Sequence, residues 1–223
     1  MAYLSAAMST PFGAIAAKYD SWYDSEEGIA IFREEVEALL LVKGRAPGRW
    51  LEVGVGTGRF ASALNVSDGV DPSEEMLSLA AARGISTRSG TAEALPYNDA
   101  AFDGVLMVAT LCFVKDPALA LHECARVLKP GGVLVAGIIP STGPWGLEYR
   151  RKAEAGHPIY SHARFFPLEE AVCLAAGAGL TLHDAASALL WSPGAQQKPE
   201  SRVIRGARRD AGFVALRFER SLR

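Results

Sequence analysis

The sequence predicts an α/β fold with a doubly wound, mostly parallel sheet. Between residues 48 and 138, short apolar segments alternate with longer segments whose apolar residues have helical spacing. The segment 102–109 is almost wholly apolar, which is typical of a strand that is buried on both faces. Strands and helices that alternate along a chain pack as parallel strands joined by helical crossovers, so both observations favour this fold class.

The elements ahead of the glycine-rich region are a helix and a strand. Residues 28–42 carry apolar side chains at helical spacing and predict an amphipathic helix. We expect its buried face to hold Ile29, Phe32, Val36, Leu39 and Leu40. The segment 44–48 contains Gly and Pro and leads into a first strand at 50–53, which a helix to about residue 64 follows.

Capping residues predict where later helices begin and end. After a second strand at 69–70, Asp71 and Pro72 fit the cap and the first position of a helix that Gly84 ends. Further helices are expected to start at 116–117 and 167–168, and further strands are expected at 85–88, 133–139, 180–190 and 212–219.

The segment 140–166 interrupts the alternation of strands and helices. It is rich in Pro, Gly, Tyr, His and Arg and has no clear period. A long segment of this kind inside a regular fold is often a lid over a site. We therefore expect it to serve the site rather than the sheet.

The turn after the first strand is the most informative local pattern. Gly54, Gly56 and Gly58 stand at alternate positions between an apolar strand and a helix start. Glycine permits positive φ and close approach of a ligand to the backbone. The helix start that follows offers free N–H groups and the positive end of a dipole. The pattern predicts a site for a nucleotide-like ligand or a carboxylate.

Two residues decide against a phosphate ligand at this turn. Arg59 stands where a dinucleotide fingerprint has its third glycine, and no Lys-Ser or Lys-Thr pair of a P-loop follows. Glu52, just before the turn, would repel a pyrophosphate but suits an ammonium or a sulfonium. S-adenosyl-L-methionine (SAM) carries both of these cations.

Five segments, in order, resemble the class I SAM-dependent methyltransferases, in particular the UbiE-like group that acts mostly on small molecules. They are Glu52–Gly58, Gly69–Leu77, Gly90–Tyr97, Ala101–Val105 and Glu123–Leu134. The resemblance implies a Rossmann-like, seven-stranded sheet with an antiparallel C-terminal edge hairpin and helices on both faces. It also implies in-line methyl transfer from SAM to a small molecule, with release of S-adenosyl-L-homocysteine (SAH).

The resemblance also divides a single domain, 1–223, into functional parts. It implies an N-terminal helical lid at 1–45, a cofactor-binding core at 48–138, a substrate-covering insert at 140–166, and a C-terminal helix with edge strands at 167–223. The lid includes the aromatic and acidic cluster around Tyr19 and Tyr23, for which anchoring of the first helix is the alternative role.

The resemblance implies a specific set of cofactor contacts. The glycines would follow the methionine part of SAM, Glu52 its amino group, and Asp71 either the ribose hydroxyls or the helix cap. Met76 fits either a ligand contact or the core, and Thr91 stands where relatives often carry Asp. The expected cofactor-binding residues are Tyr19, Glu52, Gly54, Gly56, Gly58, Asp71, Pro72, Met76, Thr91, Ala92, Glu93, Val108, Ala109 and Thr110.

The residues that would bind the methyl acceptor are less well defined by the sequence. Methyl transfer depends mostly on proximity and exclusion of water, so no universal catalytic residue is expected. His162 and Tyr23 are the candidates for one. Cys112 is either a ligand for a soft substrate or a small buried hydrophobe. The expected substrate residues are Tyr23, Cys112, Phe113, Tyr160, His162 and Arg164.

Composition argues against several other functions. The 223 residues have a formal net charge of −2, so no general attraction to nucleic acid is expected. No apolar run approaches the ~20 residues that span a bilayer, and no signal peptide is evident. The three cysteines are scattered, which favours neither a zinc site nor disulfides. We expect a cytoplasmic monomer or homodimer without a metal, bound to neither nucleic acid nor membrane.

Three alternatives remain at this point. The chain could bind SAM or SAH without transferring a methyl group. It could methylate nucleic acid, although it has no Asn-Pro-Pro-Tyr or Asp-Pro-Pro-Tyr motif. An NAD-dependent dehydrogenase is the third, and Arg59 argues against it.

Overall fold

The computed structural model describes residues 13–195 and 202–222. Residues 1–12 of the expected N-terminal lid therefore lie outside the described part.

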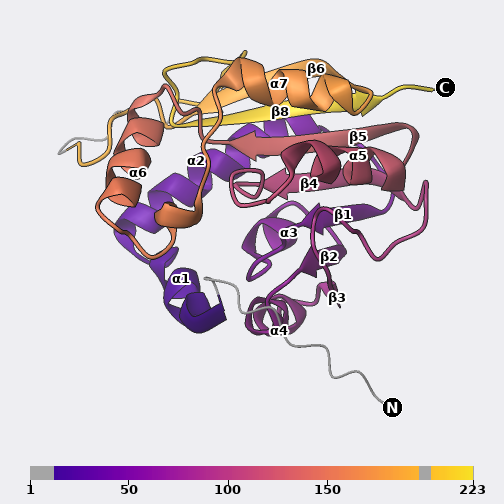
Figure 1. The fold of residues 1–223 in the computed structure, drawn as a ribbon, viewed down its shortest axis with the longest axis horizontal. Coiled ribbons are helices and arrows are strands. Elements are labelled where there is room, and N and C mark those ends of the chain that lie inside the picture. Colours follow the sequence, from indigo (N-terminus) through magenta and orange to yellow (C-terminus); the bar gives the residue numbers. More distant parts are fainter. Residues whose placement is uncertain (1–12, 196–201, 223) are drawn as a thin grey trace.

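A single twisted sheet runs through the centre of the molecule (Figure 1). Its strands, in spatial order, are β3 (Ser86–Ser89), β2 (Asp68–Asp71), β1 (Trp50–Val53), β4 (Phe102–Val108), β5 (Leu128–Ile138), β8 (Phe213–Arg220), β6 (Leu180–Ala188) and β7 (Ile204–Arg205). Neighbouring strands from β3 to β5 are parallel, and β8 is antiparallel to both β5 and β6. The predicted mostly parallel α/β sheet is confirmed.

The sheet has eight strands instead of the expected seven. The additional strand is β7, which pairs two residues with the end of β6. A two-residue strand has no sequence period of its own, so no pattern in the chain predicts it.

Helices cover both faces of the sheet (Figure 1). They are α1 (Ala16–Trp22), α2 (Glu26–Lys43), α3 (Arg59–Ala63), α4 (Glu74–Ala82), α5 (Pro117–Val127), α6 (Pro144–Glu154) and α7 (Leu168–Gly177), with 3-10 turns η1 (Gly13–Ile15) and η2 (Tyr160–His162). Apolar residues of α2, α3 and α4 join one hydrophobic core, and those of α5 and α7 join the other. Each face of the sheet therefore buries its own core.

The buried face of α2 differs from the predicted one. Ile29 and Leu40 are 55% and 45% exposed, respectively. The buried positions include Ile31, Glu34, Glu35, Ala38, Leu39 and Val42. Because two glutamates lie on the buried face of α2, a helical pattern that counts only apolar residues assigns the wrong side of the helix to the core.

Ser73 caps α4, not Asp71 as predicted. The hydroxyl of Ser73 accepts from the Met76 backbone N–H at 3.3 Å. Asp71 is still the last residue of β2, and its carboxylate turns back to the glycine turn. The other predicted cap is confirmed, because Asp116 accepts from the Leu119 N–H at 3.0 Å at the start of α5.

The segment 140–166 contains a helix, α6, which the sequence pattern did not predict. Within it only Trp145 and Gly146 are buried, so it lacks the apolar stripe of a core helix. The indole N–H of Trp145 donates to the carbonyl of Trp191 at 2.6 Å, which joins α6 to the chain after β6. The backbone N–H of Arg164 donates to the carbonyl of Cys112 at 2.7 Å, which joins the segment to the loop after β4.

Candidate functional site

The glycine turn between β1 and α3 has three residues with positive φ. Gly54, Gly56 and Gly58 have φ of +71°, +51° and +81°. A Cβ on Gly54 would lie 2.4 Å from the side chain of Thr110, and one on Gly58 would lie 2.9 Å from Cα of Ala80 in α4. A Cβ on Gly56 would meet no heavy atom within 4 Å. Packing therefore requires the outer two glycines, whereas the middle one borders open space.

That open space is part of a hollow at the carboxyl ends of β1 and β4, beneath α1. Its lining residues are Tyr19, Tyr23, Glu52, Gly54, Val55, Gly56, Thr57, Arg59, Phe60 and Val108. Ligands of open α/β sheets bind at this edge, outside the carboxyl ends of the strands. The geometry brings together the expected cofactor residues of the N-terminal segment, the glycine turn and β4.

Glu52 is the most unusual group in this hollow. It is 1% exposed, and its Oε2 has no hydrogen-bond partner among the described residues. Burial raises the pKa of its carboxyl well above the usual value, and a backbone hydrogen bond from Ala61 offsets part of this rise. A buried carboxyl with one oxygen left without a partner among the described residues, at the wall of a hollow, fits a cationic ligand such as the ammonium of SAM.

The carboxylate of Asp71 holds the glycine turn in place. Its Oδ2 accepts from the Gly56 N–H at 3.0 Å, and its Oδ1 accepts from the Ser73 N–H at 2.9 Å. Burial raises the pKa of Asp71, and these two hydrogen bonds lower it in part. Each carboxylate oxygen can accept more than one hydrogen bond, so these contacts are compatible with a ribose hydroxyl as a further donor.

The chain turns sharply where β4 ends. Ala109 has a φ of +48°, a left-handed conformation that is uncommon for a residue with a Cβ. Its N–H donates to the carbonyl of Gly137 at 2.9 Å, and the hydroxyl of Thr110 donates to the carbonyl of Val108 at 2.9 Å. Strain of this kind often accompanies functional sites, and here it adjoins the hollow.

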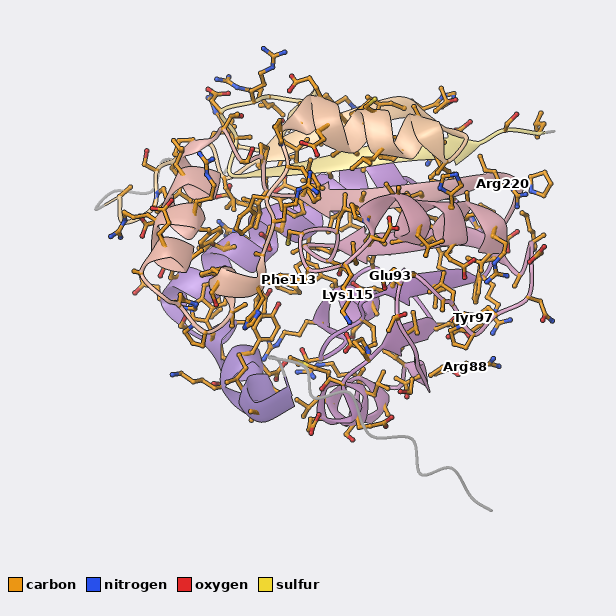
Figure 2. The ribbon with its side chains drawn as sticks, in the orientation of Figure 1. Arg88, Glu93, Tyr97, Phe113, Lys115 and Arg220 are labelled. Atoms are coloured by element: carbon orange, nitrogen blue, oxygen red, sulfur yellow. The ribbon has the colours of Figure 1, made fainter. Side chains whose placement is uncertain are left out.

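The expected adenine segment is held against the start of α5. Thr91 forms a short antiparallel bridge with Ala94, and Ala92 is 8% exposed. The Oε1 of Glu93 accepts from the backbone N–H of Lys115 at 2.7 Å, and Figure 2 shows these two residues side by side. Glu93 therefore holds this loop in place.

Two further expected cofactor residues are Met76, in the first turn of α4, and Pro72, just before this helix. Met76 is 2% exposed, which favours its alternative role as a core residue. Pro72 is half-buried beside Asp71.

The helix α1 is fastened over the glycine turn by Asp20. Arg59 donates to both carboxylate oxygens of Asp20, at 2.8 and 3.1 Å, and Arg83 does the same at 3.0 and 2.8 Å. Burial would raise the pKa of Asp20, but hydrogen bonds from Arg59, Thr57 and Arg83 hold it well below its usual value. Tyr19 of this helix and Tyr23 directly after it line the hollow, with their hydroxyls 3.1 Å apart.

Of the expected substrate residues, those in the loop after β4 lie near the hollow. The thiol of Cys112 donates to the carbonyl of Ala109 at 3.4 Å, and burial raises the pKa of this thiol to about 12. The thiol is therefore neutral at physiological pH, which favours the small-hydrophobe alternative over a thiolate ligand. The backbone N–H of Phe113 donates to the carbonyl of Thr110 at 2.9 Å.

The expected residues of the segment 140–166 separate into two groups. Tyr160 is partly buried and stacks on Tyr149, with ring centroids 4.4 Å apart. His162 is exposed, and Arg164 donates to Glu170 at 2.6 Å. Neither His162 nor Arg164 lines the hollow.

Sequence reasoning missed two residues near this site. Glu35 lies on the buried face of α2, and Tyr149 lies on α6. The sequence did contain a signal for Glu35. With Ile31, Ala38 and Leu39 it continues the helical spacing of a buried face, where a carboxylate is exceptional. Tyr149 had none, because α6 itself was not predicted.

Known proteins with similar sequence and structure place this site in a family. Residues 51–136 match the model of the methyltransferase domain family. The crystal structure of a SAM-dependent methyltransferase from Thermotoga maritima, titled a possible histamine N-methyltransferase, is 36% identical with a TM-score of 0.85, over 95% of this chain and 98% of that one.

Two curated relatives extend over nearly the whole chain. An uncharacterized protein of Mycobacterium tuberculosis is 41% identical over 93% of this chain and 73% of its own length. One from Methanocaldococcus jannaschii is 35% identical over 94% and 98%.

The chain therefore belongs to the SAM-dependent methyltransferases, and SAM is its cofactor. The UbiE-like group stays a prediction, and the dehydrogenase alternative is excluded. In the part of the chain that the structure describes, no helix is long and apolar enough to span a bilayer.

Proposed function

We propose that this protein transfers the methyl group of SAM to a small-molecule acceptor by in-line displacement, and that SAH is released. When bound, SAM supplies an electrophilic methyl group on a sulfonium. The observation that carries the proposal is the buried Glu52 carboxyl, which lines the hollow and has an oxygen without a partner among the described residues. A cationic ligand at this position would satisfy it.

The cofactor contacts belong to the same proposal. Glu52 binds the ammonium, the backbone around Gly56 follows the methionine part, and Asp71 accepts from the ribose. Thr91 and Ala92 border the adenine, and the turn at 108–110 closes the methionine end. The open space above Gly56 supports this assignment, because a ligand can approach its backbone closely there.

A small acceptor is supported by the way in which α1 covers the hollow. Helix α1 covers it, held by Asp20, and Tyr19 and Tyr23 form part of its wall. The Thermotoga relative is titled a possible histamine N-methyltransferase, so the acceptor suggested for that protein is also a small molecule. A covered hollow with such walls suits a small acceptor better than a nucleic-acid strand, which needs an open, basic groove.

Ligand-dependent unfolding tests the cofactor part of the proposal. SAH at 100 times its Kd should raise the free energy of unfolding by about 2.7 kcal/mol and the Tm by roughly 5–10 °C. NAD⁺ at the same concentration should leave the Tm unchanged. Asp71→Ala should reduce the SAH shift. An equal shift in a folded Asp71→Ala protein would contradict the site assignment.

Turnover tests the transferase part. Loss of the labelled methyl group from SAM is measured with a panel of amines, carboxylic acids, phenols and thiols. Methyl transfer to at least one class is expected. SAM binding with no transfer to any class would instead favour a SAM-binding protein without transferase activity.

A further inference from the structure

We propose that Glu35, with the tyrosines around it, binds the amino group of an amine acceptor and takes a proton from that nitrogen before methyl transfer. This inference rests on the proposed function and adds the class of acceptor and the group that activates it.

The first observation is the contrast between two adjacent buried glutamates on α2. Glu34 is 4% exposed, and both of its oxygens are used: Oε2 accepts from the Leu189 N–H at 3.0 Å and Oε1 from the Trp191 indole N–H at 3.2 Å. Glu35 is 8% exposed and has no hydrogen bond or ion pair to any residue in the described ranges. Glu34 therefore has a structural role, whereas the Glu35 carboxyl is left for a ligand.

The second observation is the set of tyrosines that faces Glu35. We define the tyrosine cluster as Tyr19 of α1, Tyr23 directly after α1, Tyr149 of α6 and Tyr160 of η2. Burial is the main cause of their raised pKa values, and the charge of Glu35 raises all four further. Three separate elements therefore bring a phenol close to one carboxyl.

The tyrosine cluster adjoins the cofactor hollow. Tyr19 and Tyr23 also line that hollow, together with Glu52. Tyr160 lies near Cys112 in the loop after β4, since the two groups interact electrostatically. A molecule held between Glu35 and the cluster would therefore lie next to the methyl donor, as in-line transfer requires.

The charges around the tyrosine cluster favour a cation. The acidic groups that interact with its phenols are Glu27, Glu35 and Glu52. The cations above its rings already have partners. Arg59, 5.6 Å from the Tyr23 ring, pairs with Asp20 and Asp24, and Lys152, 5.5 Å from the Tyr149 ring, pairs with Glu148.

An ammonium is the ligand that completes this arrangement. It would pair with the Glu35 carboxylate, and the aromatic faces would attract it by cation–π interaction. His157, which stacks on Tyr160 at 4.5 Å, adds a ring to the same side. A carboxylate or phosphate acceptor would instead meet uncompensated negative charge.

Methylation of an amine requires a base that removes a proton from the ammonium, and the Glu35 carboxylate supplies this base as well as the negative charge that binds the ammonium. The Glu35 carboxylate takes one proton from R–NH₃⁺, which gives R–NH₂ and a carboxylic acid. The nitrogen lone pair then forms the new C–N bond while the bond from sulfur to the methyl carbon breaks, and its electron pair stays on sulfur. R–NH₂⁺–CH₃ and SAH leave, and the acid returns its proton to solvent.

The proton affinity of Glu35 suits this step. Burial, and to a smaller extent the charge of Glu34, raises the pKa of its carboxyl to about 8. A base whose pKa lies near the working pH transfers protons most effectively. The other titratable groups that interact with it are Glu34 and the four tyrosines of the tyrosine cluster.

The test compares tyramine, histamine and putrescine with tyrosol, in which a hydroxyl replaces the amino group of tyramine. SAH formation and calorimetric binding to the SAH complex are measured for wild type, Glu35→Gln and Glu37→Gln. Glu37 is exposed on the same helix and serves as the control. At least one amine should bind and be methylated, and tyrosol should not.

Glu35→Gln keeps the shape of the side chain and removes the base. We expect kcat/KM for the amine to fall at least 100-fold, with the SAH-induced Tm shift unchanged and partial recovery above pH 9, where more of the amine is neutral. Glu37→Gln should behave as wild type. Amine turnover that Glu35→Gln leaves unchanged would overturn the inference.

Other outcomes separate this inference from the proposed function. SAH binding with methyl transfer to acids, phenols or thiols but not to amines overturns the inference alone. SAH binding with neither amine binding nor amine turnover overturns it as well. Absence of any stabilisation by SAM or SAH overturns the proposed function itself.

Discussion

Gly54, Gly56 and Gly58 look alike in the sequence, but the structure gives them different tasks. Gly54 lies against Thr110 and Gly58 against Ala80, so both are fixed by packing. Of the three, only Gly56 combines positive φ with open space at its Cβ position. The alternating glycines predicted a binding turn, but only the neighbouring elements show which glycine borders open space.

Gly56→Ala should weaken cofactor binding more than its cost in stability would suggest. Gly84 is a matched control, because it also has a positive φ, +84°, and no heavy atom within 4 Å of its Cβ position. Each substitution should cost about 1–2 kcal/mol through backbone strain. Only Gly56→Ala should raise the Kd for SAH, by at least tenfold, in titration calorimetry. An equal Kd in both variants would show that the space above Gly56 is not used.

Glu52 and Glu35 show what local sequence can and cannot predict. Glu52 stands next to its glycine turn, so its position at the wall of the hollow followed from adjacent residues. Glu35 acquires its surroundings from α1, α6 and η2, which converge on α2 only in the folded chain. A buried acid in an apolar row was visible in the sequence, but its partners were not.

The helix α1 depends on ion pairs more than on apolar burial. Ala16 is its one buried residue among those the structure describes, whereas Asp20 binds both Arg59 of α3 and Arg83 after α4. These side chains are 17–27% exposed, so solvent screens them less than it screens a surface pair.

Asp20→Asn should therefore loosen α1. We expect a loss of about 1–3 kcal/mol in the free energy of unfolding and faster hydrogen exchange in 16–22. Asp24→Asn is the control: its side chain is 66% exposed, and removal of its single ion pair to Arg59 should change stability by less than about 1 kcal/mol. Similar exchange rates in both variants would contradict this role of Asp20.

Local sequence also predicts some helices and strands better than others. Most strands and helices from 48 to 138 were predictable because they bury apolar residues in a clear pattern, although β3 is polar and largely exposed. Helix α6 was not, since its contacts are a few aromatic residues that stack with residues after it, such as Tyr149 on Tyr160. Elements that are held by specific side-chain contacts leave a weak periodic signal.

Stability of the folded protein should depend on pH through Glu35. In the unfolded chain this carboxyl ionises near pH 4.5, and in the folded protein its pKa is about 8. The folded form therefore keeps a proton that the unfolded form has lost between these values. Its contribution to the free energy of unfolding is present below pH 4.5 and is lost as pH rises through about 8.

Chemical denaturation of wild type and Glu35→Gln at pH 5 and pH 9 measures this contribution. Relative to the variant, wild type should lose on the order of 4 kcal/mol between the two pH values. The variant cancels effects of other groups, such as Glu52, whose raised pKa acts in the same direction. Parallel pH profiles for the two proteins would contradict the raised pKa of Glu35.

The position of β8 has a consequence for the synthesis of the chain. β8 lies between β5 and β6 and pairs with both. Ile138 of β5 pairs with Val214 of β8, and Leu180 of β6 pairs with Arg220 of β8. β6 is made before β8 and has no other long strand to pair with. On the ribosome, β1 to β5 can assemble early, but β6 and the face it shares with α2 must wait for residues 213–220 to emerge. A nascent chain stalled before β8 should therefore bind chaperones that recognise exposed strand edges, and release from them should coincide with emergence of β8.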